Sequence, residues 1–266
     1  MKTLLLPTLA LASLLILNNS ARAAEQQGPE RFEFPVGQVF VPPQGYDDND
    51  NIEIVLDGIL PNGCYSVADY TANVDPSTKQ IVPHLYVNHR RDSLCQDETH
   101  LSTALTPPVP YTLDLSVGTL GKGDYKIVYQ RPGLPQEVRA FNVERAKTAS
   151  VDDRPYAAVS SVWIPDSVRG DLTIHAELIG SLTSSCSKLS SVEVKRENDV
   201  FVVLPSLSFS QNLLCSLIML PIQQTVDLGT PGEGRYLIHV RSMSGHSVNR
   251  AFSAVVPDPE LSIKLK

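Results

Sequence analysis

The sequence predicts an all-β protein made of two tandem copies of one domain, each copy closed by one disulfide bond. Three observations lead to this prediction: an internal repeat, short alternating runs of β-branched and aromatic residues, and an even number of cysteines. After the N-terminal apolar run, no segment keeps the 3.6-residue apolar period of a helix. The 20 prolines favour turns and strand edges over helix interiors.

The repeat rests on anchors that occur in the same order in both copies. A glycine lies six residues and a leucine four residues before the first cysteine of each copy: Gly58, Leu60 and Cys64, then Gly180, Leu182 and Cys186. Each copy has a Gly-x-Tyr-x-Ile motif with a phenylalanine 16 residues after the tyrosine: Tyr125 and Phe141, then Tyr236 and Phe252. Upstream, 39–42 (VFVP) matches 162–165 (VWIP). A period of about 110–120 residues indicates tandem domains and not a solenoid.

Short alternating segments predict the strands of each copy. They lie at 52–56, 81–87 and 125–129 in the first copy and at 172–176 and 192–203 in the second. Gly, Pro, Asn and Asp separate these runs, as expected for turns. Roughly seven strands in about 115 residues is the size of an immunoglobulin-like β-sandwich.

Each copy resembles an immunoglobulin-like domain at one further point. The tyrosine of Gly-x-Tyr precedes a hydrophobic strand, so we expect Tyr125 and Tyr236 at strand corners, with the ring in the core and the hydroxyl on nearby backbone. In antibody domains the second cysteine follows this tyrosine by two residues, whereas this chain has Ile127 and Ile238 there. The resemblance implies two tandem immunoglobulin-like sandwiches whose disulfides lie elsewhere in the domain.

The four cysteines, Cys64, Cys95, Cys186 and Cys215, predict two disulfides in an oxidising compartment. Four cysteines allow three pairings. The repeat favours Cys64–Cys95 and Cys186–Cys215, because this pairing puts one bond in each copy. Zinc is the competing use of four cysteines, but no two of them form a C-x-x-C pair.

The N-terminus predicts export. Met1-Lys2, an apolar run from Leu4 to Leu17 and an Ala-x-Ala site at 21–23 are typical of a secretory signal peptide, residues 1–23. The apolar run is shorter than the roughly 20 residues of a spanning helix, and no later segment is apolar enough to span. We therefore expect a periplasmic or secreted protein without a membrane span. Its domains would be 24–146 and 147–266, with the boundary in the polar stretch 144–156.

The acidic net charge of the chain disfavours negatively charged partners. Removing residues 1–23 leaves 20 basic and 29 acidic residues, a net charge of −9. Nucleic acid and anionic membrane surfaces are therefore unfavourable partners. We expect the partner to be a protein or another component of the cell envelope.

The densest run of oxygen ligands is Asp47-Asp48-Asn49-Asp50-Asn51. Calcium takes about 6–8 oxygens, and this loop could supply several of them. The five letters resemble the D-x-N-D-N calcium motif that links cadherin repeats, but the other cadherin motifs are absent. The loop also lacks the Gly and terminal Glu of an EF-hand. It is interpreted either as a calcium site of the first copy or as a solvated turn, and no other cofactor is expected.

A second candidate binding motif is Arg169-Gly170-Asp171, in the loop that corresponds to the acidic one. The tripeptide resembles the integrin-binding motif of adhesive proteins. A loop held by glycine could present the two opposite charges to a partner. The alternative is an ordinary turn that enters a strand.

The sequence predicts no catalytic constellation. Ser185 and Lys188 form S-x-x-K, but they flank Cys186 in a serine-rich turn, and the partner motifs of the penicillin-recognising enzymes are missing. G-x-S-x-G and H-E-x-x-H do not occur, and paired cysteines leave no free thiol. The scattered histidines are His84, His89, His100, His175, His239 and His246. We therefore predict that the protein is not an enzyme.

Three further segments are candidate contact surfaces. The apolar stretches 200–204 and 213–220 are either buried core strands or exposed patches for a partner. The tail 260–266 alternates in hydrophobicity, so it is expected to add an edge strand or to pair with a partner.

The leading functional hypothesis is a non-catalytic exported binding or structural protein. Scaffolds of this kind bind through loops or sheet edges. Three alternatives stay open: a secreted inhibitor of a hydrolase, with a protruding disulfide-held loop; a periplasmic chaperone-like protein, with an apolar edge in the cleft between domains; and a hydrolase with a dispersed site. Two tandem sandwiches resemble pilus chaperones in size, but two mirrored, disulfide-bonded domains depart from that plan.

Overall fold

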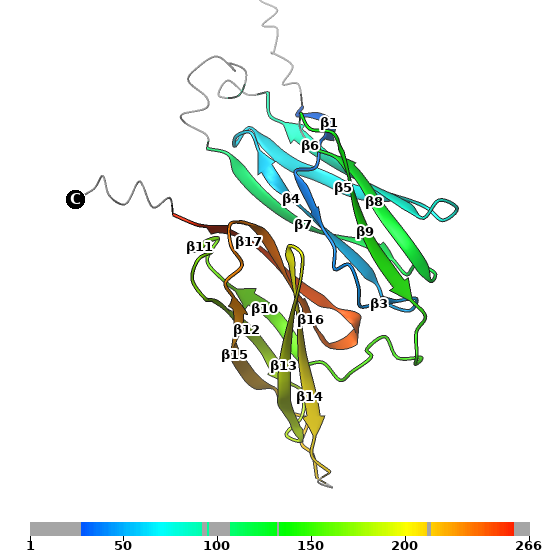
Figure 1. Cartoon of the computed structure of the whole chain (residues 1–266), viewed down its shortest axis with the longest axis vertical. Helices are drawn as coiled ribbons and strands as arrows, with labels where there is room; N and C mark the ends of the chain where they lie inside the picture. The colour runs from blue at the N-terminus through cyan, green and yellow to red at the C-terminus, as the bar shows by residue number, and fades with distance from the viewer. Residues whose placement is uncertain (1–27, 92–94, 96–106, 132, 212–213, 258–266) are drawn as a thin grey trace, which may run out of the picture.

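The computed structural model describes residues 28–91, 95, 107–131, 133–211 and 214–257. This part of the chain is all-β, with strands in four sheets and one 3₁₀ turn at Met243–Gly245. Figure 1 shows the sheets in two groups, β1–β9 and β10–β17. The predicted signal peptide (1–23) and the tail 260–266 lie outside the described residues. Within them, no helix has the length and apolar character needed to cross a membrane.

The N-terminal half (residues 28–146) contains two sheets. One has the order β1-β6-β8-β9-β3, with β5 on the other edge of β6. Its strands are β1 (Glu30–Phe34), β3 (Tyr46–Asp47), β5 (Tyr65–Asp75), β6 (Gln80–His89), β8 (Gly123–Gln130) and β9 (Gln136–Glu144). The other has the order β2-β4-β7, formed by β2 (Gln38–Phe40), β4 (Ile52–Leu60) and β7 (Val109–Gly118).

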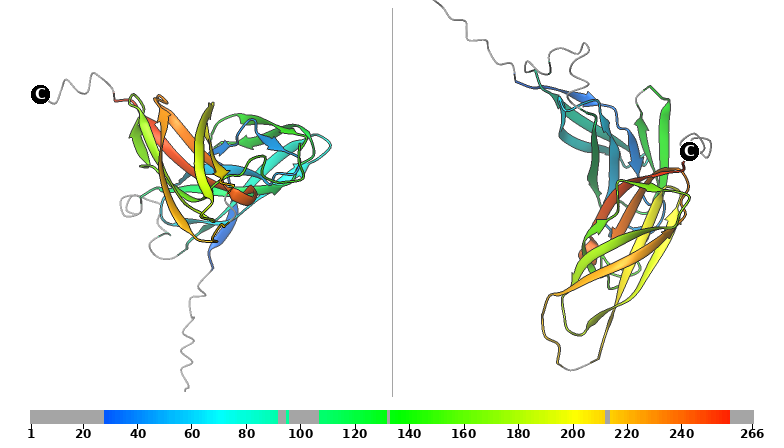
Figure 2. Two further views of the ribbon diagram at one scale, coloured as in Figure 1. Left: turned by 90° about the horizontal axis from the view of Figure 1, so that it is seen from below. Right: turned by 90° about the vertical axis from the view of Figure 1, so that its left-hand side faces the viewer.

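The C-terminal half (residues 147–257) also contains two sheets. The larger has the order β11-β17-β16-β14-β13, formed by β11 (Ser167–Arg169), β13 (Ser187–Glu197), β14 (Val200–Phe209), β16 (Gly234–Arg241) and β17 (Ser247–Val255). The smaller has the order β10-β12-β15, formed by β10 (Ala158–Trp163), β12 (Ile174–Leu182) and β15 (Leu220–Gly229). Figure 2 shows this half from two further sides.

The two halves repeat one strand arrangement, as the sequence repeat predicted. The antiparallel pair β4·β7 corresponds to β12·β15, and the hairpin β5·β6 corresponds to β13·β14. Two parallel pairs also recur: β6·β8 matches β14·β16, and β3·β9 matches β11·β17. Immunoglobulin sandwiches are built from antiparallel sheets, so the parallel pairs depart from that plan.

The repeat anchors pack in the cores. Tyr125 lies opposite Phe141 and stacks on it, and Tyr236 lies opposite Phe252 in the same way, both with ring centroids 5.6 Å apart. The Tyr125 hydroxyl donates to the Gly121 carbonyl at 2.8 Å, and the Tyr236 hydroxyl donates to the Pro231 carbonyl at 2.9 Å. The expected strand-corner role of both tyrosines is thus confirmed.

The structure contains the two predicted disulfides, Cys64–Cys95 and Cys186–Cys215, one in each half. The turn before each bond is also repeated. The Cys64 N–H donates to Asn62 Oδ1 at 2.9 Å, and the Cys186 N–H donates to Ser184 Oγ at 3.1 Å. An Asx-type or Ser-type turn therefore sets the start of β5 and of β13.

The halves meet along a seam, which we define by a third cluster of buried apolar side chains: Phe40, Val55, Val200, Leu237 and Ala251. The first two belong to β2 and β4, and the others belong to β14, β16 and β17. The outer face of the β2-β4-β7 sheet therefore packs on the outer face of the larger C-terminal sheet. The remaining apolar residues form one core in each half.

Strand β16 is buried on both faces, whereas its counterpart β8 in the N-terminal half is buried on one face only. Its last six residues, 236–241, are all buried, whereas the equivalent part of β8 alternates between buried and more exposed residues. Leu237 stands in β16 where β8 has the exposed Lys126, and Arg241 stands where β8 has the exposed Gln130. A strand that is covered on both faces reads as a continuous apolar run and not as an alternating one.

Candidate functional site

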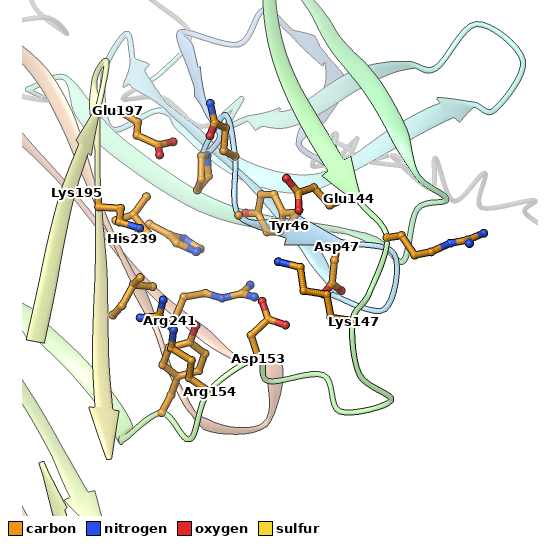
Figure 3. Close-up of a pocket in the computed structure, with 17 residues that line it drawn as sticks. Tyr46, Asp47, Glu144, Lys147, Asp153, Arg154, Lys195, Glu197, His239 and Arg241 are labelled. Carbon is orange, nitrogen blue, oxygen red and sulfur yellow. The ribbon is translucent and has the colours of Figure 1, made fainter. Parts of the chain in front are cut away.

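A pocket of about 280 Å³ lies along the seam, and Figure 3 shows the side chains that line it. Ligand pockets usually measure roughly 300–1,000 Å³ and are mostly apolar. This one is lined mainly by charged groups from both halves: Asp47, Glu144, Arg145, Lys147, Asp153, Arg154, Lys195, Glu197 and Arg241. Two of its buried lining residues, Arg241 and His239, contact residues of the N-terminal half.

Asp50 and Arg241 form a buried ion pair across the seam. The Arg241 Nη2 donates to Asp50 Oδ1 at 2.7 Å, and the side chains are 9% and 2% exposed. Asp50 Oδ2 accepts the N–H of Asp47 at 3.0 Å. Burial raises the pKa of Asp50 although Arg241 acts against the shift. Burial acts to lower the pKa of Arg241, but Asp50, Tyr46 and Tyr156 together outweigh it and the pKa is raised. Removing either partner would leave an uncompensated buried charge.

His239 packs next to this pair and is held neutral. Burial, together with the charge of Arg241, lowers its pKa to about 4. Its Nδ1 lies 2.8 Å from Asn249 Oδ1, and an amide oxygen only accepts, so Nδ1 carries the proton. The ring meets Tyr46 edge to face, with centroids 6.3 Å apart. A general base works best with a pKa near the operating pH, so His239 is suited to a structural role.

Two further ion pairs cross the seam. Arg235 of β16 donates to both carboxylate oxygens of Asp57 on β4, at 2.9 and 2.7 Å, and the Asp57 side chain is 6% exposed. Arg139 of β9 contacts Asp199, just before β14, at 2.8 Å. Ser247 of β17 also hydrogen-bonds Glu53 of β4. Charged side chains thus surround the apolar seam and fix the register between the halves.

The acidic loop is part of the same junction. Asp48 Oδ1 accepts the N–H of Ala146 at 2.8 Å, and the Asn49 side-chain amide donates to the carbonyls of Thr148 and Ser150, both at 3.1 Å. Asp47 Oδ1 accepts the N–H of Asn49 at 3.2 Å. Among the described residues, no group of three or more His, Cys, Asp or Glu side chains is arranged to hold a metal. The carboxylates of Asp47, Asp48 and Asp50 accept hydrogen bonds from backbone N–H groups and from Arg241, whereas the buried Asn49 Oδ1 has no hydrogen-bond partner within the described part of the chain.

Calcium binding by the Asp47–Asn51 loop stays a hypothesis that melting tests. Since Asp47, Asp48 and Asp50 already accept hydrogen bonds from protein groups, we expect the same melting temperature in excess EDTA as in millimolar calcium. A rise with calcium of several degrees, absent from an Asp48→Asn variant, would establish a site in the loop, because a ligand that binds only the folded state stabilises it.

The Arg169-Gly170-Asp171 tripeptide pairs its two charges with each other. Arg169 Nη2 and Nε lie 2.6 and 3.1 Å from the two carboxylate oxygens of Asp171. Gly170 is buried, and its N–H and C=O bond to Val255 and Gly232. A Cβ at Gly170 would lie 2.2 Å from the Gly232 carbonyl oxygen, so the glycine is required by close backbone contact. This geometry is that of a turn next to β11, and an adhesive role of the tripeptide stays a prediction.

An exposed apolar group lies in the disulfide-held loop between β14 and β15 and at the two strand ends that flank it. We call Phe209, Leu214, Leu217, Ile218, Met219 and Leu220 the apolar tip. Leu214 and Leu217 are 93% and 91% exposed, Met219 is 73% exposed and Phe209 is 60% exposed. In Figure 1 this loop lies at the end of the long axis, far from the N-terminal half. Of the predicted apolar stretch 213–220, residue 213 lies outside the described residues and 214–220 is exposed. The stretch 200–204 lies within β14 and is mostly buried.

The apolar tip is anchored at its base. Cys215 is bonded to Cys186, which is buried. The Ser216 N–H donates to Ser185 Oγ at 2.9 Å, and the Ser185 N–H donates to the Ser216 carbonyl at 3.0 Å. The loop is thus held to the turn before β13 by a covalent bond and by hydrogen bonds.

Removing the Cys186–Cys215 bond should destabilise the protein considerably. A Cys186→Ala/Cys215→Ala variant is expected to lose about 3–4 kcal/mol of unfolding free energy, because the bond closes a loop of 29 residues in the unfolded chain. The matched Cys64→Ala/Cys95→Ala variant should lose a similar amount, since its loop spans 31 residues. Urea unfolding followed by circular dichroism measures both. If the free energy of unfolding falls by less than about 1 kcal/mol for either pair, that disulfide does not contribute substantially to the stability of the fold.

The catalytic candidates are not brought together. Ser185 Oγ accepts a backbone N–H in the loop anchor, and Lys188 lies on the hairpin β13·β14. His84 pairs with Glu33 at 2.6 Å, and His89 stacks on Tyr65. His100 lies outside the described residues. None of these pairs places a nucleophile beside a base.

Sequence reasoning missed the seam residues, above all Asp57, Asp199, Arg235 and Arg241. The available signal was the apolar Leu237 between Tyr236 and Ile238, where β8 has the charged Lys126 between Tyr125 and Ile127. Comparisons with protein-family models, with curated proteins and with solved structures found no match to this chain.

Proposed function

We propose that this chain is an exported, non-catalytic binding protein composed of two immunoglobulin-like domains, residues 24–146 and 147–266. In this proposal the seam holds the domains as one rigid arm, and the apolar tip contacts the partner. The observation that carries it is the exposure of Leu214, Leu217 and Met219 on a loop fixed by a disulfide. Contiguous apolar side chains at a surface mark interaction sites.

The seam supports a binding role in place of catalysis. His239 is neutral and bonded to Asn249, and Arg241 is committed to Asp50, so the central groups of the pocket serve the junction. A chaperone-like protein would need an apolar edge between the domains, whereas charged side chains line this pocket. Export is supported by the predicted signal peptide and by two disulfides.

The proposal is tested by capture with matched variants. The mature protein, a Leu214→Asp/Leu217→Asp variant and a Val138→Asp control are immobilised and exposed to a detergent-free envelope extract. Val138 is also a large exposed apolar residue, but it lies on β9 of the N-terminal half. We expect components bound by wild type and control to be lost from the Leu214→Asp/Leu217→Asp variant. Equal capture by all three proteins would show that the apolar tip is not the binding surface.

A secreted inhibitor is the second candidate, because the tip is a single protruding loop next to a disulfide. An inhibitor of this kind would place Leu217 or Met219 in an apolar specificity pocket. Steady-state assays with proteases that cleave after large apolar residues test it. Inhibition that the Leu214→Asp/Leu217→Asp change abolishes would favour this candidate, and unaffected proteases would remove it.

A further inference from the structure

We infer that the apolar tip inserts into the interfacial layer of a lipid bilayer with an uncharged surface. This inference rests on the proposed function, which gives the tip the binding role, and it names the chemistry of the partner. Three features of the tip carry it: the projection of its apolar side chains, the absence of charged residues from the tip segment itself, and the pairing of backbone groups at the base of the loop.

The apolar side chains project outward and do not line a groove. Leu214 and Leu217 are more than nine-tenths exposed, and Met219 is almost three-quarters exposed. Side chains that stand out in this way are covered only by a partner that surrounds them. The acyl region of a bilayer can surround such side chains without a preformed pocket. Transfer of apolar surface out of water is favourable in proportion to the area removed from water.

The chain around the tip carries little charge. No Asp, Glu, Lys or Arg occurs from 200 to 226, or from 178 to 187, between the middle of β12 and the start of β13. Lys188 is exposed and lies opposite Ser208, next to the base of the tip. Protein partners are usually oriented by complementary charges around the contact, and the tip segment itself carries none. A single lysine at the base is not the cluster of Lys and Arg that attracts anionic lipids, so an uncharged lipid surface is the favoured one. The corresponding segment of the N-terminal half is different, since the sequence carries Asp92, Asp97 and Glu98 there.

Backbone groups at the base of the loop are already paired. Lipid offers no hydrogen bonds, so unpaired N–H and C=O groups are costly to insert. The N–H and C=O of Ser216 both bond to Ser185, and the N–H of Ser210 donates to the Cys186 carbonyl at 2.9 Å. Hydroxyl and amide side chains that flank the disulfide-bonded residues in the sequence, such as Ser184 and Gln211, suit the polar headgroup layer.

A single-tryptophan reporter tests the inference. Trp163 is the only tryptophan, so Trp163→Phe/Leu217→Trp places the emitting group at the tip, and Trp163→Phe/Val138→Trp is the matched control. Phosphatidylcholine vesicles should shift the emission of the tip reporter to shorter wavelength and leave the control unchanged. In co-sedimentation, the wild type should bind these vesicles at least tenfold more strongly than Leu214→Asp/Leu217→Asp, whose melting temperature confirms that it is folded.

Two results would overturn the inference. The first is wild-type protein that stays in the supernatant with the vesicles. The second is a concentration-dependent dimer, seen by light scattering and abolished by Leu214→Asp/Leu217→Asp, because a second copy would then cover the tip. If the vesicles fail but tip-dependent capture of a protein persists, the lipid inference falls and the proposed function stands. If neither assay responds to the substitutions, both fall.

Discussion

Replacing Arg241 with alanine is expected to lower the free energy of unfolding by about 3–5 kcal/mol, among the largest effects of any single substitution in this protein. The reason is that Asp50 would keep its buried carboxylate without the guanidinium that lies 2.7 Å from it. Burial raises the pKa of Asp50 even with Arg241 present, so the carboxylate depends on its partner to stay charged. Urea unfolding followed by circular dichroism measures the loss.

Two variants control this prediction. Arg250→Ala removes an arginine from the neighbouring strand β17, where its ion pair with Asp166 is exposed, so the loss should be below about 1 kcal/mol. Asp50→Asn/Arg241→Leu removes both buried charges and should recover most of the stability lost in the single variant. If Arg241→Ala costs no more than Arg250→Ala, the seam is not held by this pair.

Acidification is expected to destabilise the protein through His239. Its pKa in the fold is about 4, compared with 6.5 ordinarily, so between these values the unfolded chain binds more protons than the folded one. The contribution of the neutral His239 to the stability of the fold is therefore fully present above pH 6.5 and is lost as the pH falls toward 4. At about 1.4 kcal/mol per unit of pKa difference, the loss between pH 7 and pH 4.5 is roughly 2–3 kcal/mol.

A His239→Val variant isolates this contribution, since valine is the residue at the equivalent position of β8, Val128. The variant loses the hydrogen bond to Asn249 at every pH, which lowers its stability by a constant amount. The quantity to compare with wild type is therefore the change in unfolding free energy with pH. The raised pKa of Asp50 acts in the opposite direction, but it is present in both proteins and cancels in the difference. Parallel stability curves between pH 4.5 and pH 7 would contradict a buried neutral histidine.

The features predicted from sequence are those in which the two copies agree. The cysteine positions gave one bond per half, and the Gly-x-Tyr motif placed Tyr125 and Tyr236 at core corners. These features follow from local spacing, which both copies keep. The parallel pairs β6·β8 and β14·β16 were not predictable, because alternation identifies a strand but not its neighbour.

The seam could not be predicted, because it depends on how one copy sits on the other. Asp50 is part of a run that is typical of a solvated or metal-binding loop, yet in the fold its partner is Arg241, 191 residues away. The tip was only half predicted. Its apolar composition marked 213–220, but composition does not distinguish a buried strand from an exposed loop, and the disulfide is compatible with both.

Photo-crosslinking in exporting cells tests most directly whether the apolar tip is the binding surface. A photoreactive phenylalanine replaces Leu217 in one protein and Val138 in the other, and the adducts are identified by mass spectrometry. We expect adducts from position 217 and none above background from position 138, with a lipid adduct supporting the bilayer inference and a protein adduct supporting only the wider proposal. Equal labelling at both positions, or none at 217, would contradict a binding role for the tip.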